Sequence, residues 1–147
     1  MRIAVNATCF NNRPSGARQR FLGIYSELIK RMPNDEFVIF EPADCRVASW
    51  FDGLPNITAV VTPVPSEGRL RKFLAGFLYW PSALRRGNFD IFEVSHLPFV
   101  RSPYGKTLLT VHDIRGMGQE NNLFDRILFK LVLARSLKDA DHVITVS

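Results

Sequence analysis

The sequence has few cysteines and no long apolar segment, and both absences narrow the class of protein. Cys9 and Cys45 are its two cysteines, and neither belongs to a Cys-x-x-Cys motif or a Cys/His cluster. This excludes a disulfide scaffold, and two free thiols in a reducing compartment are expected. No stretch approaches the roughly 20 apolar residues that span a bilayer, and residues 1–6 are too short for the apolar core of a signal peptide. We therefore expect a cytoplasmic protein.

A second group of absences concerns nucleotide-binding and catalytic motifs. The chain has no G-x-G-x-x-G dinucleotide fingerprint, no G-x-x-x-x-G-K-[ST] phosphate loop and no G-x-S-x-G nucleophile elbow. Asn6 stands where a phosphoacceptor receiver domain requires acidic residues, and metal-ligand spacing is also missing. These absences exclude the commonest nucleotide-dependent and hydrolytic classes and predict no metal site.

What remains is the composition of one soluble globular domain. The 147 residues are 46% apolar and 22% charged, which excludes disordered, collagen-like and coiled-coil chains. Chains near this size bury roughly 70% of the surface that the unfolded chain exposes. One domain over residues 1–147 with a substantial core is therefore expected.

The net charge of +5, from 19 Lys and Arg against 14 Asp and Glu, is concentrated in the first part of the chain. Residues 1–33 hold six basic side chains and one acidic side chain, whereas residues 34–147 hold 13 of each. A duplex-binding protein usually spreads its cations along a contact face, so we expect no nucleic-acid partner. A focused charge suits a compact anion such as a phosphate, and the alternative is a solvated basic helix face.

Hydrophobic patterning predicts an alternation of strands and helices. Helices are predicted over 21–32, over 69–86 with a break at Pro81, and after an N-cap at Asn122. The strands are short apolar runs at 3–10, 36–41, 57–63, 90–94, 107–111 and 142–146, of which 36–41 and 57–63 suit strands covered on both faces. This order predicts an α/β, Rossmann-like, mostly parallel sheet with helices on both faces.

Two of the helices carry further expectations. In the last one, the buried face is predicted to hold Phe124, Ile127, Leu128, Leu131 and Ala134. The segment 69–80 mixes cations with aromatic residues, as an interfacial helix at a membrane does. Its apolar residues nearly encircle it, which favours a core helix instead.

Candidate site residues follow from the rule that ligands bind outside the carboxyl ends of parallel strands. His96 and His112 stand at such ends, and Asp113 follows His112. Because adjacent strand residues point to opposite sides, Asp113 would cap the turn or contact a sugar hydroxyl rather than orient His112. In the cationic first loop, Gly16 and Arg18 lie at the start of a helix, whose free N–H groups favour an anion.

Five segments in order resemble the N-terminal domain of family 4 glycosyltransferases, which are retaining enzymes of the GT-B fold. The T-V-H-D and A-D-x-V-I-x-V-S segments, found in this order, carry most of the resemblance. The segments are Met1–Asn6, Ser15–Arg18 running into Tyr25–Leu28, Asp90–Phe92 through His96–Pro98, Leu109–Asp113, and Ala140–Ser147.

The resemblance implies a hexosyltransferase that moves a sugar from a nucleotide-sugar donor to a glycan or lipid-linked acceptor, with no metal cofactor. His112 would lie near the donor sugar as the catalytic residue, and Gly16 and Arg18 near the donor phosphates or an acceptor anion. His96 and Asp113 would line the acceptor side. Membrane-bound acceptors would place the enzyme at the inner face of the membrane. Independently of the resemblance, the strand at 143–146 would form an exposed edge of the sheet, which favours self-association.

The sequence departs from the family pattern at three places. Ala17 stands where a second glycine is common, and Glu93 stands where relatives of this subtype often carry a histidine. The chain ends at Ser147, so we expect a missing C-terminal donor-binding domain and no sugar transfer by these 147 residues alone. The alternative is a non-catalytic Rossmann-like module that binds a nucleotide or another anion, or mediates an interaction.

Overall fold

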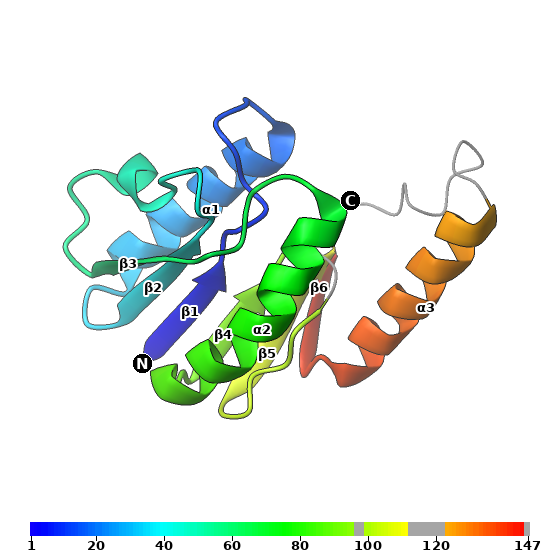
Figure 1. Ribbon diagram of the computed structural model, residues 1–147. Helices are drawn as coiled ribbons and strands as arrows, with labels where there is room; N and C mark the ends of the chain where they lie inside the picture. Colours follow the sequence, from blue (N-terminus) through cyan, green and yellow to red (C-terminus); the bar gives the residue numbers. More distant parts are fainter. Residues whose placement is uncertain (96–98, 112–122, 146–147) are drawn as a thin grey trace.

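The computed structural model describes residues 1–95, 99–111 and 123–145, which form a six-stranded, all-parallel sheet with helices on both faces (Figure 1). The strand order is β3-β2-β1-β4-β5-β6. The predicted Rossmann-like α/β fold is confirmed. Along the chain the elements are β1 (Arg2–Asn6), α1 (Gly16–Arg31), β2 (Glu36–Glu41), the 3-10 helix η1 (Ala48–Phe51), β3 (Ile57–Val61), α2 (Arg69–Gly87), β4 (Ile91–Val94), β5 (Lys106–Val111), α3 (Leu123–Asp139) and β6 (His142–Thr145).

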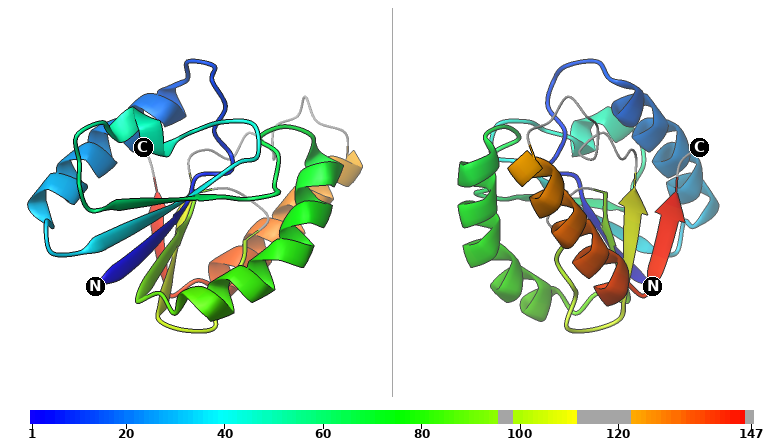
Figure 2. Two further views of the ribbon diagram at one scale, coloured as in Figure 1. Left: turned by 60° about the vertical axis from the view of Figure 1, so that its left-hand side comes forward. Right: turned by 90° about the vertical axis from the view of Figure 1, so that its right-hand side faces the viewer.

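The sheet separates two apolar cores, because successive strand residues point to opposite faces. On one face, Ile3 and Val5 of β1 pack with α1 and η1, together with Phe37 and Ile39 of β2. On the other face, Ala4 packs in the core that α2 covers, with these side chains as its buried members: Val38, Phe40, Trp80, Leu84, Phe89, Phe92 and Val94. Figure 2 shows this layering, with α1 on one side of the sheet and α2 and α3 on the other.

The edge strand β3 is less covered than the sequence predicts, whereas the edge strand β6 is exposed in agreement with the expectation of a bare edge at 143–146. In β3, residues Thr58, Ala59 and Val61 are exposed, so the expectation of a strand covered on both faces is wrong for 57–63. All four residues of β6 are exposed, and Val143 and Ile144 are among them. Apolar runs alone do not distinguish a central strand from an edge strand, because both are rich in β-branched residues.

The helices correct two further expectations. Helix α2 continues through Pro81, where the sequence predicts a break. Trp80 and Leu84, on either side of the proline, are both buried in the core under the helix, and this packing offsets the backbone hydrogen bond that a proline removes. Among the described side chains of α3, Leu133 and Ser136 are buried, whereas Ile127, Leu128, Leu131 and Ala134 of the predicted face are turned to solvent. The side chain of Phe124, also predicted on that face, lies outside the described part of the structure. Apolar residues surround α3, so its sequence does not single out one buried face.

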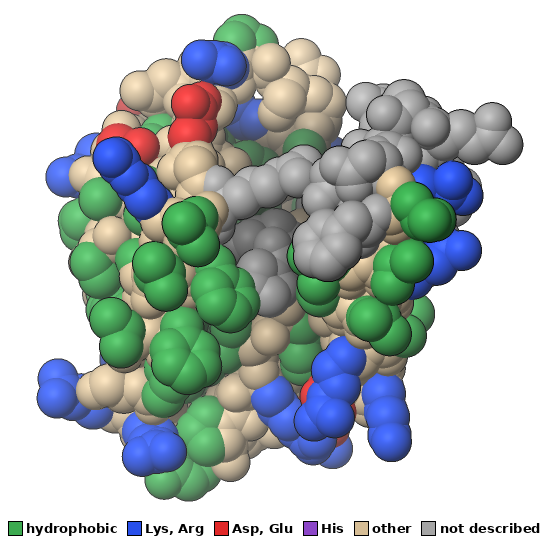
Figure 3. Space-filling view, turned by 45° about the vertical axis from the view of Figure 1, so that its right-hand side comes forward, with side chains coloured by type: hydrophobic (Ala, Val, Ile, Leu, Met, Phe, Trp, Pro, Cys, Tyr) green, Lys and Arg blue, Asp and Glu red, His purple; other side chains and the backbone are tan. Residues whose placement is uncertain are grey.

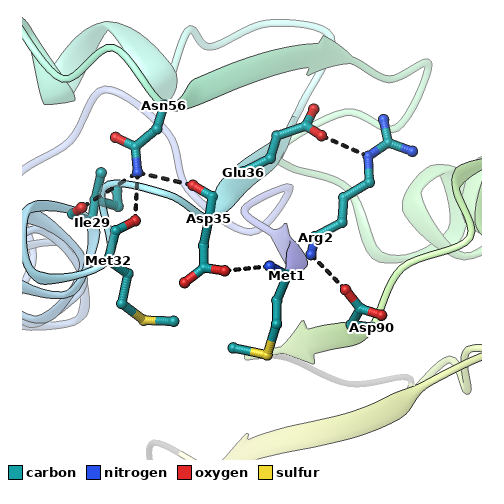
Figure 4. A network of polar contacts seen from close by, with 8 residues as sticks. All are labelled: Met1, Arg2, Ile29, Met32, Asp35, Glu36, Asn56 and Asp90. Carbon is teal, nitrogen blue, oxygen red and sulfur yellow. Dashed lines mark hydrogen bonds and ion pairs between the residues drawn. The ribbon is translucent and has the colours of Figure 1, made fainter.

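Polar contacts join the amino ends of the strands to the end of α1 (Figure 4). The Asn56 side-chain N–H₂ donates to the carbonyl oxygens of Met32 and Asp35 at 3.0 Å each, and lies 3.4 Å from that of Ile29. The last carbonyls of a helix have no partner within the helix. The Met32 carbonyl also accepts the backbone N–H of Asp35 at 3.1 Å, so Asn56 adds a second donor there and ties the turn after α1 to the start of β3. Arg2 pairs with Glu36 at 2.9 Å and its backbone N–H donates to Asp90 at 2.7 Å.

Both cysteines are free thiols, as predicted, with Cys45 buried and Cys9 half-buried. Within the described parts of the chain, no helix combines the length and the apolar character needed to cross a membrane.

Candidate functional site at the switch point

The strand order places a topological switch point between β1 and β4. The chain crosses from β1 to β2 on one side of the sheet and later returns to pair β4 with β1 on the other. In open parallel sheets, ligands bind outside the carboxyl ends of the strands at such a point. The candidate site is therefore the region next to Asn6 and Val94, where β1 and β4 end.

A hydrogen-bonded turn follows β1. The Asn6 side-chain carbonyl accepts a hydrogen bond from the Thr8 hydroxyl at 2.7 Å and another from the Thr8 backbone N–H at 3.2 Å. Both residues are buried, and the Ala7 N–H donates to the carbonyl of Phe40 at 3.0 Å. An asparagine that binds the backbone two residues ahead forms an Asx turn. This turn fixes the point where the chain leaves the sheet and places Cys9 beside β4.

Cys9 and Ser95 bring the loops after β1 and β4 together. The Cys9 Sγ lies 3.7 Å from the Ser95 Oγ, and the Ser95 hydroxyl lies 3.5 Å from the Asn6 carbonyl that it donates to. Burial raises the pKa of the Cys9 thiol above its ordinary value, although Ser95 and Lys72 oppose the rise. The thiol is therefore protonated at neutral pH, and a protonated thiol is a poor nucleophile.

Glu93 provides a half-buried carboxyl group in the same part of the sheet. Its Oε1 accepts a hydrogen bond of 2.7 Å from the Thr110 hydroxyl of β5. Burial raises the pKa of Glu93, and the Thr110 hydrogen bond and the charge of Arg20 oppose that rise. A half-buried carboxyl group with a raised pKa near the carboxyl end of a strand is a candidate functional group.

A small cavity of about 120 Å³ lies between the switch point and α2. Its polar groups are the Thr8 hydroxyl and the Lys72 ammonium group, and its wall is otherwise apolar. The Lys72 Nζ donates to the Ser66 carbonyl at 3.1 Å, and burial lowers the pKa of Lys72 below its ordinary value. The cavity combines one cation with an apolar wall, which consists of Val64, Phe73, Gly76, Phe77, Trp80, Phe99 and Val100.

A larger hollow of about 400 Å³ lies under the second half of α2. Its lining includes Arg2 and Gly87, so it reaches the amino ends of the strands. Ligands of open parallel sheets bind at the opposite, carboxyl ends. We therefore place the candidate site at the smaller cavity.

The structure describes two of the five predicted site residues. Gly16 is the first residue of α1, and a side chain there would meet nothing within 4 Å. The three other residues, His96, His112 and Asp113, lie outside the described residues. In the chain, His96 comes directly after Ser95, and His112 directly after Val111, the last residue of β5.

Arg18 takes part in contacts that organise the first loop. Its guanidinium lies 3.9 Å from the ring centroid of Trp50 and donates to the Asn12 carbonyl at 3.2 Å. The Arg18 backbone N–H donates to the Ser15 hydroxyl at 3.1 Å, which makes Ser15 the N-cap of α1. The predicted role of Arg18 at an anion stays a prediction, and the structure adds a packing role on Trp50.

Several polar residues at the candidate site were not among the site residues predicted from the sequence: Thr8, Cys9, Lys72, Glu93, Ser95 and Thr110. A signal existed for Glu93, because a carboxylate inside the apolar run Ile91–Val94 has to be buried and paired. No signal existed for Lys72, since only the packing of α2 brings it to the loop after β1. Among the described residues, no cluster of three or more His, Cys, Asp or Glu side chains could hold a metal ion.

Comparison of the chain with protein-family models, with curated proteins and with solved structures gave no match. The fold and the switch point therefore define the class: a Rossmann-like parallel α/β domain with a polar site at the carboxyl ends of β1 and β4.

Proposed function

We propose that this chain is the N-terminal, acceptor-side domain of a retaining glycosyltransferase of the GT-B fold. The enzyme would transfer a hexose from a nucleotide-sugar to a glycan or lipid-linked acceptor without a metal cofactor. One observation carries the proposal: the segments that resemble this family include β1, β4 and β5, and polar groups from the loops after β1 and β4 meet at the switch point. Ligands of such sheets bind there.

In the proposed reaction, the residues of this domain bind and orient the two substrates. His112 hydrogen-bonds the donor sugar as positive charge develops at its anomeric carbon. Gly16 and Arg18 lie near the donor phosphates or an acceptor anion, and His96 and Asp113 line the acceptor side. Cationic groups and helix N-termini stabilise the negative charge of the departing nucleoside diphosphate.

The cavity beside α2 supports an amphiphilic acceptor. Lys72 would pair with an anionic group, and the Thr8 hydroxyl, whose proton goes to Asn6, would accept a hydrogen bond from a sugar hydroxyl. The aromatic wall of Phe73, Phe77 and Trp80 favours an apolar portion next to that anion. Of the two acceptor classes, the lipid-linked one combines both features.

The test uses the complete gene product that contains residues 1–147, with transfer of labelled hexose as the readout. The His112→Ala variant should lower turnover by at least about 100-fold, with little change in the thermal midpoint. His142→Ala is the matched control, because His142 is exposed at the amino end of β6, and it should leave turnover unchanged. Wild-type turnover in His112→Ala would overturn the assignment.

A second measurement separates the enzyme from the non-catalytic alternative. The proposal expects the coding sequence to continue into a second domain with two glutamates on one helix face. Binding of a nucleoside diphosphate by a protein that transfers no sugar to any acceptor would instead favour the anion-binding module.

A further inference from the structure

Helix α2 exposes an apolar face instead of burying it. Leu70, Phe73, Leu74, Phe77 and Leu78 are between 49% and 78% exposed, and all lie in the first three turns. The burial expected from the sequence is therefore wrong for these residues. Figure 3 shows hydrophobic side chains gathered over α2. A contiguous apolar surface on a soluble domain marks an interaction site.

The same helix is strongly cationic. Over Arg69–Gly87 it carries five Lys and Arg side chains and no Asp or Glu. Arg71 and Arg85 are exposed, and within the described residues neither has a hydrogen-bond or ion-pair partner. The exposed stripe continues from the apolar turns to Arg85 at helical spacing, since Leu70, Leu74, Phe77, Pro81 and Arg85 recur at i, i+4, i+7, i+11 and i+15.

We propose that the exposed face of α2 docks on an anionic lipid surface. Apolar side chains on the outside of a helix, combined with cations on the same stripe, are the composition of an interfacial membrane helix. The cations would pair with lipid phosphates while Phe73, Phe77 and the leucines enter the acyl boundary. A symmetric pairing of two copies through this face would bring Arg71 and Arg85 of both copies to one apolar interface, which charge repulsion opposes.

The lipid-facing side chains also border the cavity. Phe73 and Phe77 belong both to the exposed face and to the wall of the cavity that contains Lys72. An amphiphile held in the membrane would therefore reach the cavity without leaving an apolar surface. The docking proposal stands on the exposed residues of α2 and does not depend on the proposed sugar transfer.

The test is co-sedimentation of the 147-residue chain with vesicles of phosphatidylcholine alone and of phosphatidylcholine with 30% phosphatidylglycerol. We expect binding to the anionic vesicles at low salt, at least about tenfold weaker binding to the neutral ones, and weakening as salt increases. Absence of binding to anionic vesicles at low salt would overturn the proposal.

Two pairs of variants separate docking from general charge and hydrophobicity. Phe77→Ser with Leu78→Ser should lower partitioning at least about tenfold, whereas Ile24→Ser on α1, across the sheet, should not change it. Arg71→Glu with Arg85→Glu should lower it similarly, whereas Lys30→Glu with Arg31→Glu changes the net charge equally and should have a smaller effect. Equal losses in both charge variants would contradict a specific α2 face.

Folding and self-association are measured on the same samples. All four targeted α2 side chains are exposed, so circular dichroism and the thermal midpoint should match those of the wild type. A dimer in sedimentation equilibrium that Phe77→Ser with Leu78→Ser dissociates would overturn the proposal in favour of a second copy on this face.

Discussion

The Thr110 hydroxyl donates a hydrogen bond of 2.7 Å to the Glu93 carboxyl group, between the neighbouring parallel strands β5 and β4. Glu93 pairs in register with Leu108, so Thr110 is its diagonal neighbour on the same face of the sheet. The hydrogen bond gives a half-buried acidic group a partner at the sheet itself, next to the carboxyl ends of the strands.

Glu93 should make stability depend on pH. Its pKa in the folded state is raised above the ordinary 4.5, mainly by burial. Between 4.5 and the raised value, the folded state keeps a proton that the unfolded state loses, so stability falls as the pH rises. Glu93→Gln removes this term. The stability of Glu93→Gln relative to wild type should therefore grow by up to about 1.4 kcal/mol per pH unit within that window, in urea unfolding from pH 4 to 8.

A second variant, Thr110→Val, tests whether Glu93 causes the pH dependence of stability. The Thr110 hydrogen bond lowers the pKa of Glu93, so Thr110→Val should raise it further and extend the window to higher pH. A difference between Glu93→Gln and wild type that is independent of pH would show that Glu93 titrates alike in both states.

The two faces of α2 should respond differently to truncation. Leu84 is 1% exposed in the core under α2, and Leu78 is 78% exposed. Leu84→Ala should lower the free energy of unfolding by about 2–5 kcal/mol, because it removes buried methyl groups and leaves a cavity. Leu78→Ala should change it by less than about 0.5 kcal/mol. Chemical denaturation of both variants measures this, and similar losses would mean that Leu78 is also buried.

Substitution by alanine should have opposite effects on stability at Gly105 and at Gly16. Gly105 has a φ of +64°, and a Cβ there would lie 2.3 Å from the carbonyl oxygens of Phe89 and Asp90. Gly105→Ala should therefore destabilise the fold by more than about 1 kcal/mol. Gly16 has open space around it, and Gly16→Ala in α1 should leave stability unchanged or raise it by up to about 1 kcal/mol. Thermal unfolding distinguishes the two.

The Gly16→Ala variant also tests whether a ligand binds at the start of α1. Because Gly16→Ala should keep the fold intact, a loss of nucleotide or phosphate binding in this variant would report close approach of a ligand to α1. A strongly destabilised Gly16→Ala protein would contradict the open space found beside this residue.

Asn56 should contribute to stability through the end of α1. Asn56→Ala leaves the carbonyl oxygens of Met32 and Asp35 without this partner, and should lower the free energy of unfolding by about 1–3 kcal/mol. The matched control is Asn34→Ala, since Asn34 is exposed in the adjoining turn, and its effect should be below about 0.5 kcal/mol. Urea denaturation of both proteins would show equal effects if Asn56 had no capping role.

The order of strands and helices was predictable from the sequence, whereas the solvent exposure of their apolar residues was not. The runs at 36–41 and 107–111 became β2 and β5 because short β-branched segments separated by helices fit a parallel sheet well. The buried face of α3 was not predictable, since Leu131 and Leu133 are equally apolar and only the sheet distinguishes them. Within the candidate site, the loops after β1 and β4 were predicted because they follow the carboxyl ends of strands. Lys72 was not predicted, because it belongs to a helix that only tertiary packing brings to these loops.

By itself, the sequence determined the α/β class, the free thiols and the position of polar residues at strand ends. These are local properties, which depend on periodicity, on turn residues and on spacing. The tertiary structure decided which groups meet. It placed Cys9 beside Ser95, 86 positions away, brought Lys72 to the cavity after β1, and left a second apolar face of α2 exposed, opposite the face that packs on the sheet. Such relationships follow from strand order and helix packing, which link segments that are distant in the sequence.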